Sequence, residues 1–327
     1  MTADHDQIET TQTERALRAL HADDSEWALE AGDLDRLAAF SEIVVPLAAE
    51  RDSSRGLYVA ARLAERWDVP IRLISVDPTG PAGSVTIAAG GRLEGARAAL
   101  MARHPALEVS DVLLGAVDEP VAALHDALTA GDLVVLATDA AGTGTRPSFA
   151  EALADRWGGP LLLIGPEADI DLDIEPGAEI IVGVDGSALA ERALPLALAM
   201  AHRFELRPLL MQVVSTDHAA QLDRLRSRGE AVSDSAYLRD VAERLGAGWE
   251  IVHDDDPVAA LVRVTAERRV PLVVLSTHGA TGLARQVFGS VAMGVVHGAR
   301  CPVLVRSGYR SRPLALPGTT AARRPRD

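Results

Sequence analysis

The sequence predicts an α/β protein with two tandem open-sheet domains, each a five-stranded parallel sheet with helices on both faces. Three observations lead to this prediction. Short apolar runs alternate with helical stretches, the apolar runs lack polar alternation, and four segments of the first half recur in the second. The composition agrees, because 48% of the residues are hydrophobic and only 3% aromatic. The 327 residues suffice for two such domains.

The internal repeat is the strongest of these observations, because a repeat missed at this stage changes the whole fold prediction. The paired segments, in chain order, are Glu42–Val45 with Glu179–Val182, Pro120–Leu124 with Pro257–Leu261, Leu133–Thr138 with Leu272–Thr277, and Pro160–Ile164 with Pro302–Arg306. The offset between copies drifts only from 137 to 142 residues. The chain therefore contains one domain twice.

Each copy supplies five strands. In the first copy the apolar runs predict strands near 42–47, 70–76, 107–114, 132–138 and 160–164. In the second they predict strands near 179–184, 207–214, 249–253, 271–276 and 302–306, with helices near 188–203, 218–245, 256–269 and 289–298. Right-handed crossovers place such helices on both sides of the sheet.

The predicted organisation has five parts. They are a helical extension (1–39), the first domain (40–166), a linker (167–177), the second domain (178–307) and a tail (308–327). The linker is acidic and bounded by Pro and Gly, which disfavour a long regular element. The tail is rich in Arg and Pro and is predicted to be disordered.

The net charge and the cysteine content argue against several classes of protein. The formal net charge of −15 repels nucleic acid and anionic membranes. The single cysteine, Cys301, excludes an internal disulfide framework and fits a reducing compartment. The first residues are acidic and polar, and no apolar run approaches the ~20 residues of a membrane span. We expect a cytoplasmic protein.

Residues 276–291 are the stretch that points to a ligand. They follow the fourth strand of the second copy, and open α/β sheets bind ligands at the carboxyl ends of their strands. Gly279 allows a tight turn close to a ligand. Gly289 and Ser290 stand where the last helix begins, so unpaired backbone N–H groups and the helix dipole can hold a phosphate there.

Asp185 ends the first strand of the second copy and would face the same crevice. Its carboxylate can accept hydrogen bonds from ribose hydroxyls. The alternative is that Asp185 and Ser187 only cap the helix starting near Ala188. Likewise, Gly279 and Gly289 are also explained by ordinary turn and helix-start chemistry.

With these residues in view, the sequence resembles the universal stress protein family, in a tandem form with two such domains. The ATP-binding subgroup carries Gly, two residues, Gly, nine residues, then Gly followed by Ser or Thr. Gly279, Gly289 and Ser290 fit this pattern, whereas Ser276 replaces the first glycine. The ending Cys301-Pro302-Val-Leu-Val305 is also typical. The resemblance implies a Rossmann-like fold of the adenine nucleotide alpha hydrolase type.

The resemblance also implies a ligand, ATP, with Mg²⁺ carried on its phosphates. By position, Asp185 would meet the ribose and the backbone near Val213 the adenine. The implied ligand-binding residues of the second domain are Gly183, Val184, Asp185, Val213, Ser276, His278, Gly279, Gly289, Ser290 and Val291.

The first copy departs from this pattern. Ala48 stands in place of Asp185, Ala140 in place of Gly279, and the loop to Pro147-Ser148 is three residues shorter. Because Pro147 has no N–H to offer, we expect the first copy to be structural. Single-domain relatives pair through the last strand, so the resemblance implies an intrachain dimer through Pro160–Ile164 and Pro302–Val305. A homodimer of the whole chain remains open.

The leading hypothesis is a non-enzymatic stress-response or signalling module that binds ATP. The sequence lacks a Walker motif and the Ser-Gly-Gly-x-Asp-Ser loop of related pyrophosphatases, and no arginine pair is evident. A weak ATP-hydrolysing enzyme and a nucleotide-free interaction scaffold are the alternatives.

Three further residue groups each have a functional and a structural explanation. His278 is either a catalytic acid or base, or an ordinary loop residue. His253 with Asp254–Asp256 forms either a metal site or a helix cap. Cys301 is either a redox sensor or a core residue. In each case we favour the structural explanation.

Overall fold

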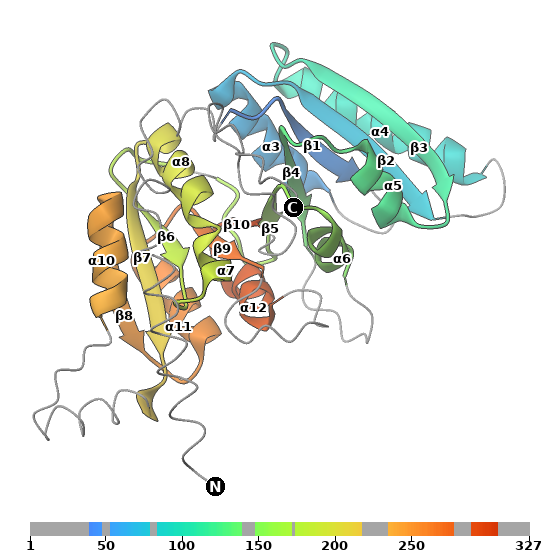
Figure 1. The fold of residues 1–327 in the computed structure, drawn as a ribbon. Helices are drawn as coiled ribbons and strands as arrows, with labels where there is room; N and C mark the ends of the chain where they lie inside the picture. Colours follow the sequence, from blue (N-terminus) through green and yellow to red (C-terminus); the bar gives the residue numbers. More distant parts are fainter. Residues whose placement is uncertain are drawn as a thin grey trace, which may run out of the picture.

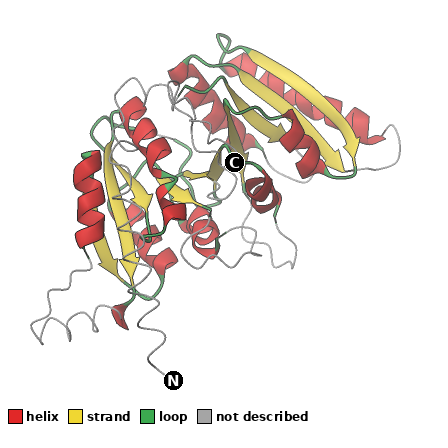
Figure 2. Ribbon diagram, in the orientation of Figure 1, coloured by secondary structure: helices red, strands yellow, loops and turns green. Residues whose placement is uncertain are grey.

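A computed structural model describes residues 39–47, 53–78, 84–138, 148–171, 174–217, 235–277 and 289–306. Within these residues ten strands form a single sheet with helices on both faces (Figure 1, Figure 2). The predicted helical turns before residue 39 and the tail after residue 307 lie outside the described residues.

The first half contains the following elements: β1 (Glu42–Leu47), α3 (Ser54–Trp67), β2 (Ile71–Pro78), α4 (Ser84–Arg103), β3 (Val109–Val117), α5 (Pro120–Ala127), β4 (Asp132–Ala137), α6 (Phe149–Arg156) and β5 (Pro160–Ile164). All five predicted strands are present.

The second half repeats the succession: β6 (Glu179–Gly183), α7 (Ala188–Glu191), α8 (Leu194–Phe204), β7 (Arg207–Val214), α10 (Ala236–Leu245), β8 (Gly248–His253), α11 (Pro257–Glu267), β9 (Val273–Ser276), α12 (Ser290–Gly298) and β10 (Val303–Arg306). The predicted helix 188–203 is interrupted at Arg192 and Ala193. Pro195, which lacks an N–H, lies in the first turn of α8, where prolines are tolerated. Of the helix predicted at 218–245, residues 218–234 lie outside the described residues.

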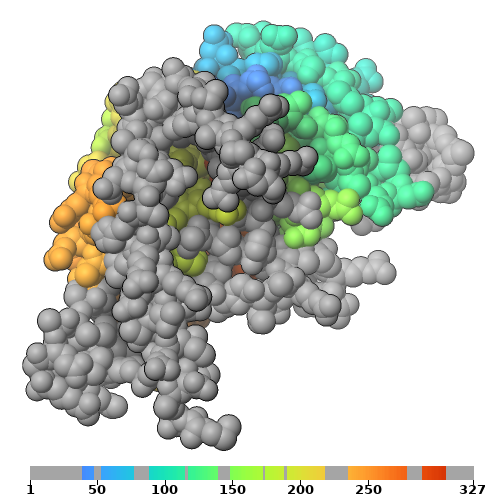
Figure 3. Space-filling view, viewed as in Figure 1, coloured from blue at the N-terminus to red at the C-terminus, as the bar shows by residue number. Residues whose placement is uncertain are grey.

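The strands follow the order β3-β2-β1-β4-β5-β10-β9-β6-β7-β8. Each half is a parallel five-stranded sheet, and the two halves share the same internal order. They are joined edge to edge by an antiparallel pairing of β5 with β10. In Figure 3 the first half, blue to green, and the region of α10, in orange, lie on opposite sides of the visible face.

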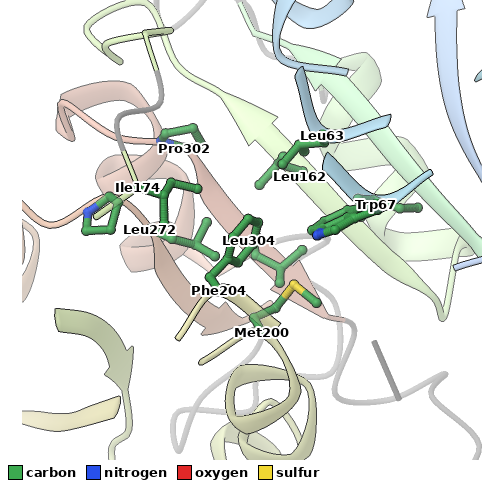
Figure 4. Close-up of a pocket in the computed structure, with 11 residues that line it drawn as sticks. Leu63, Trp67, Leu162, Ile174, Met200, Phe204, Leu272, Pro302 and Leu304 are labelled. Atoms are coloured by element: carbon green, nitrogen blue, oxygen red, sulfur yellow. The ribbon is translucent and has the colours of Figure 1, made fainter. Parts of the chain in front are cut away.

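The joint between the halves brings equivalent positions of the repeat together. Leu162 pairs with Leu304, its own counterpart in the second copy. The rings of Trp67 and Phe204, also counterparts, lie 5.3 Å apart. Side chains from both halves surround a small apolar cavity of about 20 Å³ (Figure 4). That volume holds about one water molecule, too little for an organic ligand.

The core lies on both faces of the sheet. One face packs under α3, α4, α8 and α10, and the other under α5, α6, α11 and α12. Cys301 is a buried member of the second layer, as predicted, and burial raises the pKa of its thiol to about 12. No helix in the described part of the chain has the length and apolarity to cross a membrane.

Candidate functional site

The candidate site lies at the carboxyl ends of the second-half strands. Ser276 ends β9, Asp185 follows β6, and α12 begins at Ser290. Because β6 and β9 are neighbouring parallel strands, their carboxyl ends meet at one edge of the sheet. His278 and Gly279, which we expected here, lie outside the described residues.

The N-cap residue of α12 is Gly289, which has no side chain, and no described side chain caps this helix end. The carbonyl oxygen of Gly289 accepts the first intrahelical bond, from the N–H of Met293 at 3.1 Å. The N–H groups of Ser290, Val291 and Ala292 therefore have no acceptor within the helix. Together with the helix dipole, these groups form a positive end that favours an anion.

The N–H of Gly289 is not one of these groups, because it donates to the carbonyl oxygen of Thr277 at 2.6 Å. A Cβ added at Gly289 would lie 2.7 Å from that same oxygen. Glycine is therefore required because the two ends of the 277–289 loop approach each other closely.

Asp185 is exposed and lies in a capped turn. Its Oδ1 accepts the N–H of Ser187 at 3.0 Å, and the Ser187 hydroxyl accepts the N–H of Ala190 at 3.1 Å. This is the capping that we gave as the alternative explanation. Since a carboxylate offers about four acceptor positions, the capping bond leaves it able to accept others.

The buried Glu191 and the half-buried Tyr237 form a pair beside this turn, which the sequence analysis missed. The Tyr237 hydroxyl, from α10, donates to the Glu191 carboxylate, whose residue is only 8% exposed. Burial raises the pKa of Glu191, and the charge of Asp185 adds to this effect. The two residues lie 46 positions apart, so no local pattern in the sequence indicates that they meet.

The remaining predicted residues of the first two strands are placed by the sheet. Gly183 allows Leu275 to pack closely, since an added Cβ would lie 2.4 Å from Leu275 Cδ2. Val184 is buried, and its N–H donates to the carbonyl of Met211 at 2.9 Å. Val213 is half-buried on β7. Their positions have structural reasons, whether or not a ligand is present.

Ser276 and Arg306 are a second pair that the sequence analysis did not connect. They stand opposite each other in the register of β9 and β10. The Oγ of Ser276 and the Nε of Arg306 are both buried without a hydrogen-bond partner in the described part of the chain. The repeat does contain a sign that Arg306 is unusual, because its counterpart in the first copy is the apolar Ile164.

The corresponding helix start in the first half is closed. Ser148 caps α6: its side chain accepts the N–H of Glu151 at 3.2 Å, while its own N–H donates to the Glu151 carboxylate at 2.5 Å. The carboxylate thus occupies the place of an external anion. Ala48, Ala140 and Pro147 lie outside the described residues.

The acidic run before α11 caps that helix, as predicted. Asp256 accepts the N–H groups of Val258 and Ala259, each at 3.0 Å. Asp254 accepts from the backbone of Asp256, and Asp255 accepts from Thr216. Within the described ranges no three His, Cys, Asp or Glu residues are grouped as a metal site would need.

Comparison with known proteins identifies sequences that are similar to this chain. Residues 178–306 match the sequence model of the Universal stress protein family. A universal stress protein of Mycobacterium tuberculosis (strain H37Rv) is 31% identical over an alignment of 197 residues that covers 57% of this chain and 65% of that protein. A universal stress protein of Methanocaldococcus jannaschii is 27% identical over 139 residues, covering 39% of this chain and 80% of that protein. The match thus spans less than two thirds of the mycobacterial relative.

Solved structures extend the likeness in fold to both halves. A universal stress protein from Archaeoglobus fulgidus superposes with a TM-score of 0.58 at 13% identity, covering 82% of this chain and 98% of that one. A functionally unknown protein from Pseudomonas aeruginosa superposes with a TM-score of 0.55 at 14% identity, covering 84% and 94%. At these identities the likeness concerns the fold alone.

Proposed function

We propose that the second half of the chain, whose residues 178–306 match the universal stress protein family model, binds ATP. In this proposal the nucleotide carries Mg²⁺ on its phosphates, and the protein acts as a stress-response or signalling module. It is not primarily an enzyme. The first half serves as an intrachain dimer partner.

The observation that carries the proposal is the uncapped amino end of α12 beside β9. Three consecutive backbone N–H groups, at Ser290, Val291 and Ala292, have no intrahelical acceptor and no side-chain cap. A phosphate group supplies the acceptors and the negative charge that this helix end lacks. Ser290 is exposed, so its hydroxyl is able to add a further donor.

The other residues near this edge suit the rest of a nucleotide. The exposed carboxylate of Asp185 is suited to accept ribose hydroxyls. The half-buried Val213, at the end of β7, offers apolar surface and backbone groups for an adenine ring. Bound Mg²⁺ would offset part of the phosphate charge, and this chain's residues would orient the nucleotide.

The proposed role of the first half rests on the sheet. Its strand β5 continues the second-half sheet through β10, and its own helix start at α6 is filled by Glu151. It therefore covers an edge of the ligand-binding half and has no equivalent anion position.

One observation favours a second candidate, a nucleotide-free interaction scaffold. The bond from the Gly289 N–H to the Thr277 carbonyl joins residues 277 and 289 through the backbone alone. A scaffold would need such internal closure. It would not need the uncapped helix end.

The test is to identify and titrate the ligand. Mass spectrometry of small molecules released on denaturing the purified protein should detect one adenine nucleotide per chain, and ATP with Mg²⁺ should bind in calorimetry. Gly289→Val should abolish binding, because the side chain collides with Thr277 and displaces the start of α12. Ser148→Val, at the start of α6, is the matched control and should retain binding.

The alternatives give different results. Absence of released nucleotide together with absence of binding heat would establish the scaffold instead. Steady-state ATP hydrolysis should not exceed that of the Asp185→Ala, Gly289→Val double variant. A rate clearly above it would establish an enzyme.

A further inference from the structure

A half-buried arginine ends strand β10, where an apolar residue would serve the fold. Arg306 is half-buried, and its Nε atom has no hydrogen-bond partner among the residues that the structure describes. The same holds for the Oγ of Ser276 at the end of β9. Burying polar atoms without partners costs free energy, so they require an explanation.

The two orphaned atoms belong to side chains on the same face of the sheet. Arg306 and Ser276 are register partners in parallel strands. Two residues earlier on each strand, Leu304 and Val274 both pack in the layer under α8. Because side chains alternate along a strand, Arg306 and Ser276 point to that same layer.

A second cation lies close to Arg306. Arg192 stands in the turn between α7 and α8, and α7 packs against β9. Burial lowers the pKa of Arg306, and the positive charge of Arg192 lowers it further. Within the described residues Arg306 has no salt bridge to a carboxylate. Arg192 is exposed and acts on Arg306 through its charge, and two such cations favour the arrival of an anion.

The first half shows that the fold does not need Ser276 and Arg306 at this register position. There, Ala137 and Ile164 occupy the same register between β4 and β5. The counterpart of Arg192 is Arg55, which donates to the carbonyls of Pro166 and Ala168 in the linker. In that half an apolar pair ends the two strands.

We propose that Arg306 and Arg192, with the hydroxyl of Ser276, form an anion subsite that binds a phosphate group of the nucleotide. Guanidinium groups match phosphate oxygens in pairs of hydrogen bonds. The site would thereby select nucleotides with several phosphates over nucleosides. This inference rests on the proposed function, and it adds the cationic side chains that would bind the phosphate groups.

The test compares ligands that differ in phosphate number on the full chain. Arg306→Met should weaken ATP·Mg binding by about 10- to 100-fold, the effect of losing hydrogen bonds to a charged group. Adenosine binding should change less than about threefold. Arg300→Met is the matched control, because it removes the same charge from an exposed position near the opposite end of β10. It should bind ATP like the wild type.

A melting experiment separates this function from a structural role. Without nucleotide, Arg306→Met should melt at the same temperature as the wild type or higher, since a buried unpartnered atom is removed. A lower melting temperature with unchanged ATP affinity would overturn the subsite.

A third titration separates this subsite from the proposed function. If the wild type binds no ATP, the proposed function fails. Tripolyphosphate then tests the subsite alone: binding that Arg306→Met abolishes supports it, and absence of binding overturns it.

Discussion

The amino ends of α6 and α12 occupy corresponding places in the two halves but differ in what satisfies them. At α6 the side chains of Ser148 and Glu151 complete each other's hydrogen bonds, so the helix end carries its own anion. At α12 no side chain of the described residues plays this part, and the exposed Ser290 stands at the first helical position. The comparison teaches that a repeated fold can cap a helix end with one carboxylate in one copy and leave it without that cap in the other.

The strand ends next to these helices also differ between the halves, because they are apolar in the first half and polar in the second. The register pair is Ala137 with Ile164 in the first half and Ser276 with Arg306 in the second. The backbone pairing is the same, so it is the side chains that distinguish a sheet end built for packing from one that holds polar atoms.

The largest expected effect comes from giving α12 the anion that α6 has. Ser290→Glu places a carboxylate at the uncapped helix end, where it competes with phosphate. We expect about tenfold weaker ATP binding and an unchanged or slightly higher melting temperature, measured by calorimetry and thermal unfolding. Ser290→Gln, of similar size and uncharged, should lose much less affinity; equal losses would mean that size, not charge, closes the site.

The next effect concerns the packing that holds α12 in place. A Cβ added at Gly294 would lie 2.7 Å from Val258 Cγ2 on α11. Gly294→Ala should therefore lower the free energy of unfolding by about 1–3 kcal/mol, as overpacking does. Gly91→Ala on α4 is the control, because an added Cβ there meets nothing within 4 Å. It should raise stability by about 0.4–1 kcal/mol in urea unfolding.

The smallest effect is a pH dependence confined to the second half, where Glu191 is buried. Burial raises its pKa above the ordinary 4.5, so the folded state holds this proton to higher pH than the unfolded state. The contribution of Glu191 to stability is therefore greatest below about pH 4.5 and is lost as pH rises through the folded pKa. Glu191→Gln removes this loss.

Urea unfolding at pH 4 and pH 8 measures this change. The free energy of unfolding of wild type relative to Glu191→Gln should be lower at pH 8 than at pH 4. Glu94→Gln, on the exposed surface of α4, is the control. A difference between Glu191→Gln and wild type that is the same at both pH values would contradict the burial effect.

Much of the fold follows from the sequence, because buried parallel strands are short apolar runs. Strands β9 and β10 begin one or two residues later than predicted, after the segments that contain Pro271 and Pro302, since proline cannot donate to a ladder. The break between α7 and α8 was missed because Pro195 was not treated as the start of a new helix.

The candidate site was less predictable than the fold. Strand ends place Asp185 and Ser276 correctly, because parallel strands share one carboxyl edge. The Glu191–Tyr237 pair depends on how α10 packs, which no local pattern encodes. Arg306 was visible as a departure from Ile164, but its meaning required the register that sets it beside Ser276.

The antiparallel joint of β5 and β10 has a consequence for how the molecule responds to dilution and mutation. Because both strands belong to one chain, closing the joint is a unimolecular step that does not depend on protein concentration. Two identical chains meeting at such an edge would have to carry every substitution on both sides. A single chain is released from that symmetry, so one side is free to accumulate changes that would be harmful if doubled.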